Sequence, residues 1–386
     1  MFSKRIDSIS LSSIVKYNKL VKQREKEGIV FIKANIGQPD FKTDRRYYKA
    51  LNSIDNITNG YSSACGIKTL RHAVSKYYNN NQNTNKFSIK DIVITQGASD
   101  AIIKILYTIC DSGDDVIVLE PFFSDYKIYA QIVGINLIPV SYHNFSFKSL
   151  QKKITSKTKA ILFANPNNPD GEVLDHHDIV NLIDFAKQNN LFIISDEVYS
   201  GFIYNSEFFS LSSYDYNNII IVDSASKKLN SCGSRIGYVI SKNNDLLKRI
   251  IILNDSKISI SNVEQYAVSE MLINYDEIIK YECQIYKRRL IQIEQLLNKY
   301  KIKYIVPKGG ISLLVELPIQ DSDDYVYWLV KKYENRGKSL LLTSAKEFYI
   351  GNEGYNKVRL TLTIPDNQIP EVINLMVDSI KKYNGG

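Results

Sequence analysis

The middle of the chain alternates short apolar runs with longer amphipathic stretches, and this alternation limits the folds that it can adopt. An apolar run of about five residues is typical of a buried strand, whereas apolar residues three or four positions apart indicate a helix. Repeated strand–helix units favour an α/β layer with a mostly parallel sheet. We expect strands at 91–95, 115–119, 159–163, 191–195, 218–222 and 236–240, and helices at 98–110, 124–133 and 175–189.

The pattern changes after residue 275. Residues 276–300 read as one long, charged, amphipathic helix. Apolar runs at 311–317 and 358–362 predict strands, and 324–336 and 370–382 predict helices. A chain of 386 residues is long enough for two domains. We expect an N-terminal arm and part of a small domain at 1–44, a large three-layer α/β domain at 45–275, and a small α+β domain at 276–386.

Charge and composition argue against several kinds of partner. The net charge is +8, but the 49 basic residues are dispersed, whereas a nucleic-acid-binding face needs them concentrated. No apolar run approaches the roughly 20 residues of a membrane span, and no apolar segment of a signal peptide follows Met1–Arg5. The four cysteines lie far apart, without metal-ligand spacing. We therefore expect a cytoplasmic protein that binds no nucleic acid, membrane or metal.

Polar residues gather where the predicted strands end, which is where ligands bind in such sheets. Lys227 follows one strand and has Ser224 just upstream and Arg235 eight positions downstream. A lysine amine forms a Schiff base with an aldehyde once it is deprotonated, while hydroxyls and a guanidinium suit a phosphate. The set is suited to a phosphorylated aldehyde such as pyridoxal phosphate.

Two further motifs fit a pyridine ring. Asp196 directly follows an apolar strand, and a buried carboxylate there is costly unless it meets a cation such as a protonated ring nitrogen. Tyr199, three positions on, could donate a hydrogen bond to a ring phenolate. The loop 165–171 holds two Asn-Pro pairs, which stiffen it and could fix the amide of Asn168 in one direction. The alternative for Asp196 is a surface turn or a helix cap.

Three weaker signals have ordinary structural alternatives that are individually more common. Ala98 and Ser99 begin a predicted helix, whose N–H groups attract phosphate, although Ser99 could be a simple cap. Phe123 could stack on a planar ring or pack in the core. Arg359 could bind a carboxylate in bidentate fashion or form a surface salt bridge.

Together these motifs resemble those of the class I/II aminotransferases, the fold-type I pyridoxal-phosphate enzymes. The similarity runs from Asn35–Phe41 to Arg359, nearly the whole chain, and the motif order and spacing match. The resemblance implies an enzyme that moves the α-amino group of an L-amino acid to a 2-oxo acid by a ping-pong mechanism. It also implies an obligate homodimer whose active sites are shared across the interface.

The resemblance assigns a role to each residue. Lys227 would bond to the cofactor and shuttle the proton, with Asp196 on the pyridine N–H and Asn168 and Tyr199 on the ring oxygen. Phe123 would stack on the ring, and Tyr61 would reach the phosphate of the other subunit. The phosphate would be held by Ala98, Ser99, Ser224 and Arg235, and the substrate by Arg359, Asn168, Ile36 and Gly37.

The chain departs from the family pattern in several places. Asp170 replaces the usual threonine after Asn168-Pro169 and adds an acid near the site. Ser234 precedes Arg235 where an aromatic is common, and Ser312 replaces another aromatic, which would make the substrate pocket more polar or roomier. Some aspartate-specific relatives carry a lysine where Ser99 stands, so its absence weakens an aspartate assignment.

Two other functions remain open. Because fold does not fix function, these departures allow a lyase, cyclase or oxidase that uses the same cofactor. A regulator that senses ligands through this fold would need an added DNA-binding domain, and the roughly 35 residues before the Gly37 loop are too few for one.

Overall fold

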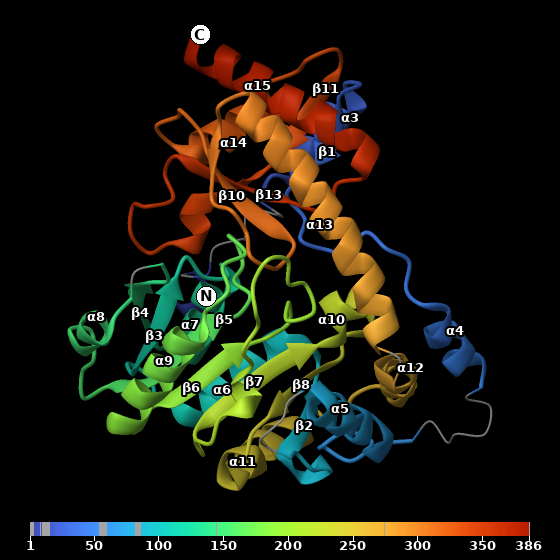
Figure 1. Cartoon of the computed structure of the whole chain (residues 1–386), viewed down its shortest axis with the longest axis vertical. Coiled ribbons are helices and arrows are strands. Elements are labelled where there is room, and N and C mark those ends of the chain that lie inside the picture. The colour runs from blue at the N-terminus through green and yellow to red at the C-terminus, as the bar shows by residue number, and fades with distance from the viewer. Residues whose placement is uncertain are drawn as a thin grey trace.

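The computed structural model describes residues 4–7, 9, 16–53, 60–81, 86–143, 145–273 and 275–385. It confirms the predicted α/β architecture, with a seven-stranded sheet in the order β2-β8-β7-β6-β5-β3-β4 in the lower part of Figure 1. Strand β8 runs antiparallel to both of its neighbours, β2 and β7, and the other pairs of adjacent strands are parallel. The strands are β2 (Ile92–Thr95), β3 (Asp115–Glu120), β4 (Asn136–Ser141), β5 (Thr158–Ala164), β6 (Phe192–Asp196), β7 (Ile219–Ser224) and β8 (Gly237–Ile240).

Helices cover both faces of this sheet, because its strands are apolar on both sides. Ile92 and Ile94 belong to one hydrophobic core and Val93 to the other, as the alternation of side chains along a strand requires. One face packs against α6 (Gly97–Ile109), α7 (Asp125–Val133) and α11 (Asn244–Asp255). The other packs against α5 (Lys68–Asn81), α9 (His176–Gln188) and α12 (Asn262–Ile273), which α4 (Arg45–Asn52) joins.

A second, smaller group of elements lies above the large sheet in Figure 1, and the long helix α13 (Tyr275–Lys299) extends from one group to the other. Its antiparallel sheet has the order β12-β13-β10-β9, and β1 pairs in parallel with β11. The strands are β1 (Val30–Lys33), β9 (Lys303–Tyr304), β10 (Ser312–Glu316), β11 (Lys338–Leu341), β12 (Thr343–Ser344) and β13 (Lys357–Thr361). The helices are α3 (Asn18–Lys26), α14 (Ser322–Lys331) and α15 (Ile369–Gly385).

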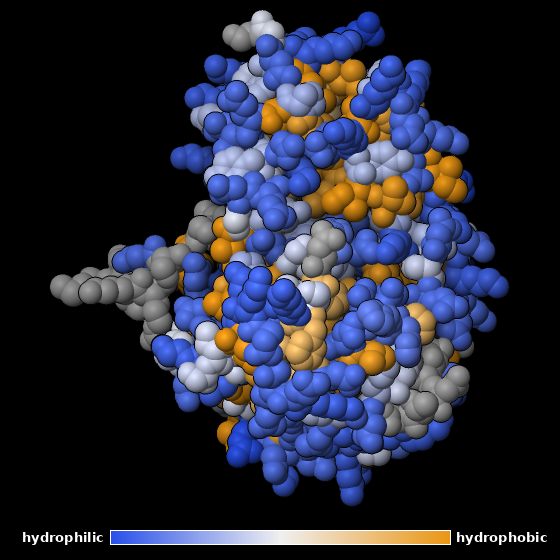
Figure 2. Space-filling view, turned by 60° about the vertical axis from the view of Figure 1, so that its left-hand side comes forward, coloured by the Kyte–Doolittle hydropathy of each residue, from blue (hydrophilic) through white to orange (hydrophobic). Residues whose placement is uncertain are grey.

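Short helices complete the described chain: α1 (Lys4–Asp7), α8 (Phe147–Gln151), α10 (Ala225–Lys228) and the 3-10 turns η2 (Ile89–Asp91), η3 (Leu211–Ser213), η4 (Cys232–Ser234), η5 (Ala345–Phe348) and η6 (Asp366–Gln368). No helix within the described ranges is long and apolar enough to cross a membrane. Figure 2 shows a largely hydrophilic surface, with apolar side chains gathered near the junction of the two groups of elements.

The structure differs from the sequence-based elements in several places, among them strands β1 and β11, which were not predicted. The helix predicted at 324–336 ends at Lys331, because Lys332 leaves the helical conformation with a φ of −124°. Arg336 and Gly337, with φ of 52° and 74°, then close a turn between Asn335 and Lys338. Edge strand β4 was not predicted, since it carries Pro139 and is only partly buried. The domain boundaries at 44 and 275 stay a prediction.

Candidate active site

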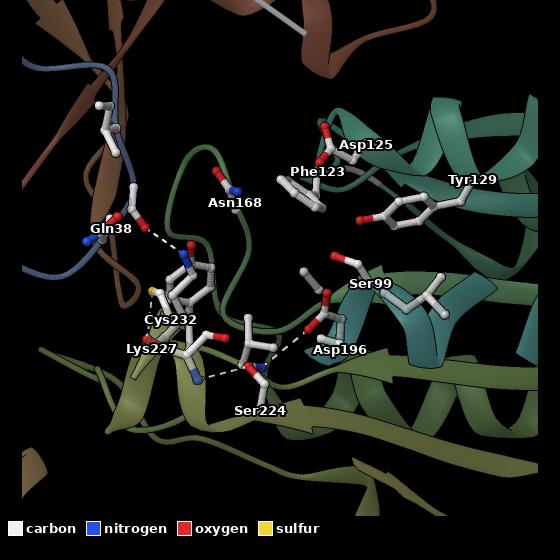
Figure 3. Close-up of a pocket in the computed structure, with 18 of the residues that line it drawn as sticks. Gln38, Ser99, Phe123, Asp125, Tyr129, Asn168, Asp196, Ser224, Lys227 and Cys232 are labelled. Carbon is white, nitrogen blue, oxygen red and sulfur yellow. Dashed lines mark hydrogen bonds between the residues drawn. The ribbon is translucent and has the colours of Figure 1, made fainter. Parts of the chain in front are cut away.

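A cavity of about 340 Å³ lies beyond the carboxyl ends of the parallel strands. β8 runs the opposite way, so the residues that precede it, including Arg235, reach the same edge as those that follow β2 and β7. The segment 36–38 and Arg359 of β13 close the cavity from the smaller group of elements. Figure 3 shows Lys227, Asn168, Asp196, Phe123 and Ser99 around this space.

One end of the cavity is built to hold an anion. Ser99 lies in the first turn of α6, where N–H groups point outward, and Ser224 ends β7 and caps α10. Gly97 has φ +82°, and a Cβ there would lie 2.6 Å from Nη2 of Arg235. Only glycine therefore lets the guanidinium lie over this helix N-terminus. Hydroxyls, amides and a guanidinium converge here, as phosphate recognition requires.

The structure distinguishes two neighbouring lysines. Nζ of Lys227 donates a hydrogen bond to the carbonyl of Gly37 at 2.6 Å and lines the cavity. Lys228 is turned away and forms an ion pair with Asp223, both fully buried, and the hydroxyls of Tyr78 and Tyr238 each donate to Oδ2 of Asp223 at 3.0 Å. Burial alone would lower the pKa of Lys228, but the Asp223 carboxylate outweighs it and raises that pKa. Lys228 stays protonated and anchors α10, which presents Lys227 to the cavity.

Asp196 ends β6 and is 4% exposed. Its Oδ2 accepts a hydrogen bond from the Tyr126 hydroxyl at 2.9 Å and its Oδ1 one from the Val198 amide at 3.3 Å. Burial raises the pKa of this carboxyl to about 6. Among the described residues it forms no ion pair, so a ring N–H cation in the cavity would offset the cost of its burial.

Arg359 and Asn168 meet across the cavity. Arg359 is buried, and its Nη1 donates to Oδ1 of Asn168 at 3.0 Å while its Nη2 donates to the carbonyl of Asn35 at 2.6 Å. Burial lowers the pKa of this guanidinium. Its acceptors, which include the Thr343 hydroxyl at 3.5 Å, are uncharged, so the guanidinium forms no ion pair among the described residues, and Glu347 and Asp125 attract it only through space. The same bond directs the Asn168 amide group, leaving its NH₂ free to donate.

The family departures face away from the cavity. Asp170 is fully buried, accepts a hydrogen bond from Asn167 at 2.9 Å and pairs with Nε2 of His143 at 3.0 Å. The Ser312 hydroxyl donates to the carbonyl of Pro169 at 2.9 Å, and that of Ser234 donates to its own turn. None of the three lines the cavity. The Ser312 hydroxyl therefore adds no polar group to the cavity lining and instead contacts the Asn168 loop, while the expectation of a roomier pocket stays a prediction.

The cavity brings together all but one of the predicted site residues: Ile36, Gly37, Ala98, Ser99, Phe123, Asn168, Asp196, Tyr199, Ser224, Lys227, Arg235 and Arg359. Tyr61 lies elsewhere and is 83% exposed. Sequence reasoning missed Asp125 and Tyr129, which also line the cavity. Their spacing of four within one helix could have revealed them. The roles of these residues stay predictions.

Glu197, next to Asp196, makes the free energy of unfolding depend on pH. It is 1% exposed and accepts hydrogen bonds from the Ser210 hydroxyl and the Leu211 amide. Burial raises its pKa from 4.5 to about 7. Between these values the native state keeps a proton that the unfolded state has released, so the free energy of unfolding falls as pH rises.

We expect Glu197→Gln to remove up to about 3 kcal/mol of this fall between pH 4.5 and 7 in the cofactor-free protein. Denaturant unfolding at several pH values measures it. The exposed control Glu270→Gln should leave the slope unchanged, and an equal slope in Glu197→Gln and the unsubstituted protein would contradict the expectation.

Comparisons with known proteins agree with this geometry. A family described as "Aminotransferase class I and II" matches residues 30–375. The aspartate aminotransferase of Sulfolobus acidocaldarius is 29% identical, over 99% of this chain and 98% of that protein. The (5-formylfuran-3-yl)methyl phosphate transaminase of Methanocaldococcus jannaschii is 28% identical, over 99% and 100%. A solved structure of aspartate aminotransferase from Thermotoga maritima has a TM-score of 0.88 at 25% identity and covers 100% of both chains. One from Thermus thermophilus, with a TM-score of 0.90 at 21% identity over 98% and 99%, shows the shared fold alone.

Proposed function

Because the chain belongs to the class I and II aminotransferases, it transfers amino groups, and we propose that it does so with pyridoxal 5′-phosphate. In this proposal it takes the α-amino group of an L-amino acid and passes it to a 2-oxo acid. The observation that carries the proposal is that one cavity holds both the Lys227 amine and the buried Asp196 carboxylate, which forms no ion pair among the described residues.

The residues present fit this cofactor. The anion-binding end formed by Ser99, Ser224 and Arg235 suits its phosphate, and Asp196 suits its ring nitrogen. Phe123 offers an aromatic face to the ring. When bound, pyridoxal phosphate supplies a carbon that accepts the amino group and a ring that takes up the electron pair released at the substrate Cα.

The protein's own groups would bind, orient and move protons. Arg359 would bind the substrate α-carboxylate, since its guanidinium is buried and all of its hydrogen-bond acceptors within the described residues are uncharged. Asn168 and Tyr199 would donate hydrogen bonds to the ring oxygen. Lys227, once free, would carry the proton from the substrate Cα, because it is the one lysine among the described residues that line the cavity.

A single cavity would serve donor and acceptor in turn, which requires a ping-pong mechanism. We expect the cofactor-loaded enzyme, mixed with a panel of L-amino acids, to lose its visible absorbance and yield pyridoxamine phosphate. Addition of 2-oxoglutarate or pyruvate should restore it. Ammonia release without pyridoxamine phosphate would instead support the lyase, cyclase or oxidase alternative. The positions that motivated this alternative, Asp170, Ser234 and Ser312, do not line the cavity and so do not support it.

Assembly, domain limits and location belong to the same proposal. The exposed Tyr61 supports a homodimer in which each subunit's Tyr61 reaches the other's phosphate. Pairing of β1 with β11 supports placing residues 1–44 with the small domain at 276–386, apart from the large domain at 45–275. Four unpaired cysteines are consistent with the cytoplasm.

A further inference from the structure

Asp125 is an acidic residue of the cavity that the proposed chemistry does not use. It is the first residue of α7, two positions after Phe123, and Tyr129 lies one turn later on the same face. Both line the cavity, and Asp125 is half-buried. Figure 3 shows Asp125 and Tyr129 on one helix beside Phe123, on the side of the cavity away from Lys227.

Every other charged side chain of the cavity has a partner in the proposed chemistry. The described residues that line it include four further charged groups, Lys227, Arg235, Arg359 and Asp196. Arg235 would bind the cofactor's phosphate, and Asp196 would pair with its ring nitrogen. Lys227 would be engaged at the reacting carbon, and the substrate α-carboxylate would take Arg359. Asp125 is then left as an anion with no counter-charge.

In the free enzyme the Arg359 guanidinium attracts the Asp125 carboxylate, and the Ser124 hydroxyl donates a hydrogen bond to it. The substrate α-carboxylate would compete with Asp125 for this guanidinium. Burial raises the pKa of this carboxyl. The Tyr129 hydroxyl is already hydrogen-bonded to the Ser99 side chain. A cation brought into the cavity would offset the cost of burying this carboxylate.

We propose that Asp125 determines substrate specificity and selects L-amino acids whose side chain ends in an ammonium group, such as diamino acids. This inference rests on the proposed function. A side-chain carboxylate would instead face Asp125, and no described cation of the cavity remains free to balance it. The subsite therefore disfavours aspartate and glutamate, in agreement with Ser99 standing where some aspartate-specific relatives carry a lysine.

A purely structural role for Asp125 makes a different prediction. An acid in the first turn of a helix stabilises it through the helix dipole. Its replacement would then lower stability and affect all substrates alike. Selectivity between a charged side chain and an uncharged one of the same shape distinguishes the two roles.

The test uses matched substrates on the cofactor-loaded enzyme. L-Lysine is compared with L-norleucine, and L-ornithine with L-norvaline, because each pair differs only in the terminal ammonium group. Pyridoxamine phosphate formation gives kcat/KM for each, and L-glutamate is measured beside them. The variants are Asp125→Asn and the control Asp245→Asn, which alters an exposed first-turn acid of α11.

We expect Asp125→Asn to lower kcat/KM for the better diamino acid by about 10- to 100-fold, the worth of a hydrogen bond to a charged group. Values for its uncharged counterpart should change by less than about threefold, and glutamate should improve. Asp245→Asn should change none of them. Thermal unfolding of both variants separates loss of folding from loss of selectivity.

Equal losses for charged and uncharged substrates in Asp125→Asn would overturn the proposal, as would an unsubstituted enzyme that prefers glutamate to both diamino acids. These failures differ from failure of the proposed function, in which no amino acid of any kind yields pyridoxamine phosphate.

Discussion

Replacing Lys227 with alanine is expected to reduce amino transfer by about 10⁴-fold or more. The substitution removes both the amine that would bond to the cofactor and the group that would carry the proton. Lys228 cannot replace it, because it is fully buried and paired with Asp223. Steady-state rates with the best donor found, together with the visible spectrum of the loaded protein, measure the loss.

The matched control is Lys248→Ala on α11, whose side chain is 72% exposed and forms an ion pair with the exposed Asp245. It should keep the rate and the spectrum of the unsubstituted protein, since exposed ion pairs contribute little. Because Lys227 is half-buried and its amine donates to a loop carbonyl, Lys227→Ala should still fold. A Lys227→Ala protein that retained turnover within tenfold, a margin of about 1.4 kcal/mol, would show that the site has been misassigned.

The second large effect is expected for Asp196→Asn, with a loss of about 10²- to 10⁴-fold in kcat. Breaking a buried charge pair by removing one partner costs about 3–5 kcal/mol, which corresponds to this range. The amide keeps the shape of the side chain and can still bond to the Tyr126 hydroxyl, but it cannot hold positive charge on the ring nitrogen. Cofactor content, thermal unfolding and kcat are measured together.

The exposed control Asp184→Asn on α9 should be unaffected in all three. If Asp196→Asn bound the cofactor and folded normally yet kept full kcat, Asp196 would not act on the ring. If it only lost stability, its role would be structural.

Much of the large sheet could be predicted because its strands are buried on both faces and read as continuous apolar runs. Strand order and the reversed direction of β8 could not, since they depend on contacts between distant segments. Strands β1 and β11 were also missed. Each is four residues long and pairs only with the other, 308 positions away in the register of Val30 with Lys338 (338 − 30 = 308).

The same division holds for the candidate site. Three residues could be identified because each follows the end of a predicted strand in an unusual setting. Lys227 has phosphate-binding neighbours, Asp196 would be costly to bury without a cation, and Asn168 lies in a loop stiffened by two prolines. Asp125 and the Lys228–Asp223 pair could not be identified, because an acid that starts a helix and a lysine beside another lysine are common in any sequence. Which lysine faces the cavity depends on the three side chains that converge on Asp223, those of Lys228, Tyr78 and Tyr238, and only the folded chain shows that.

The most direct test of amino transfer is the fate of the donor nitrogen. The cofactor-loaded enzyme is incubated with ¹⁵N-labelled L-amino acids and either 2-oxoglutarate or pyruvate, and the products are separated and weighed by mass spectrometry. We predict that the label appears in glutamate or alanine in equal amount to the 2-oxo acid formed from the donor. Label recovered as free ammonia, or left entirely in the donor with every amino acid tried, would contradict the account.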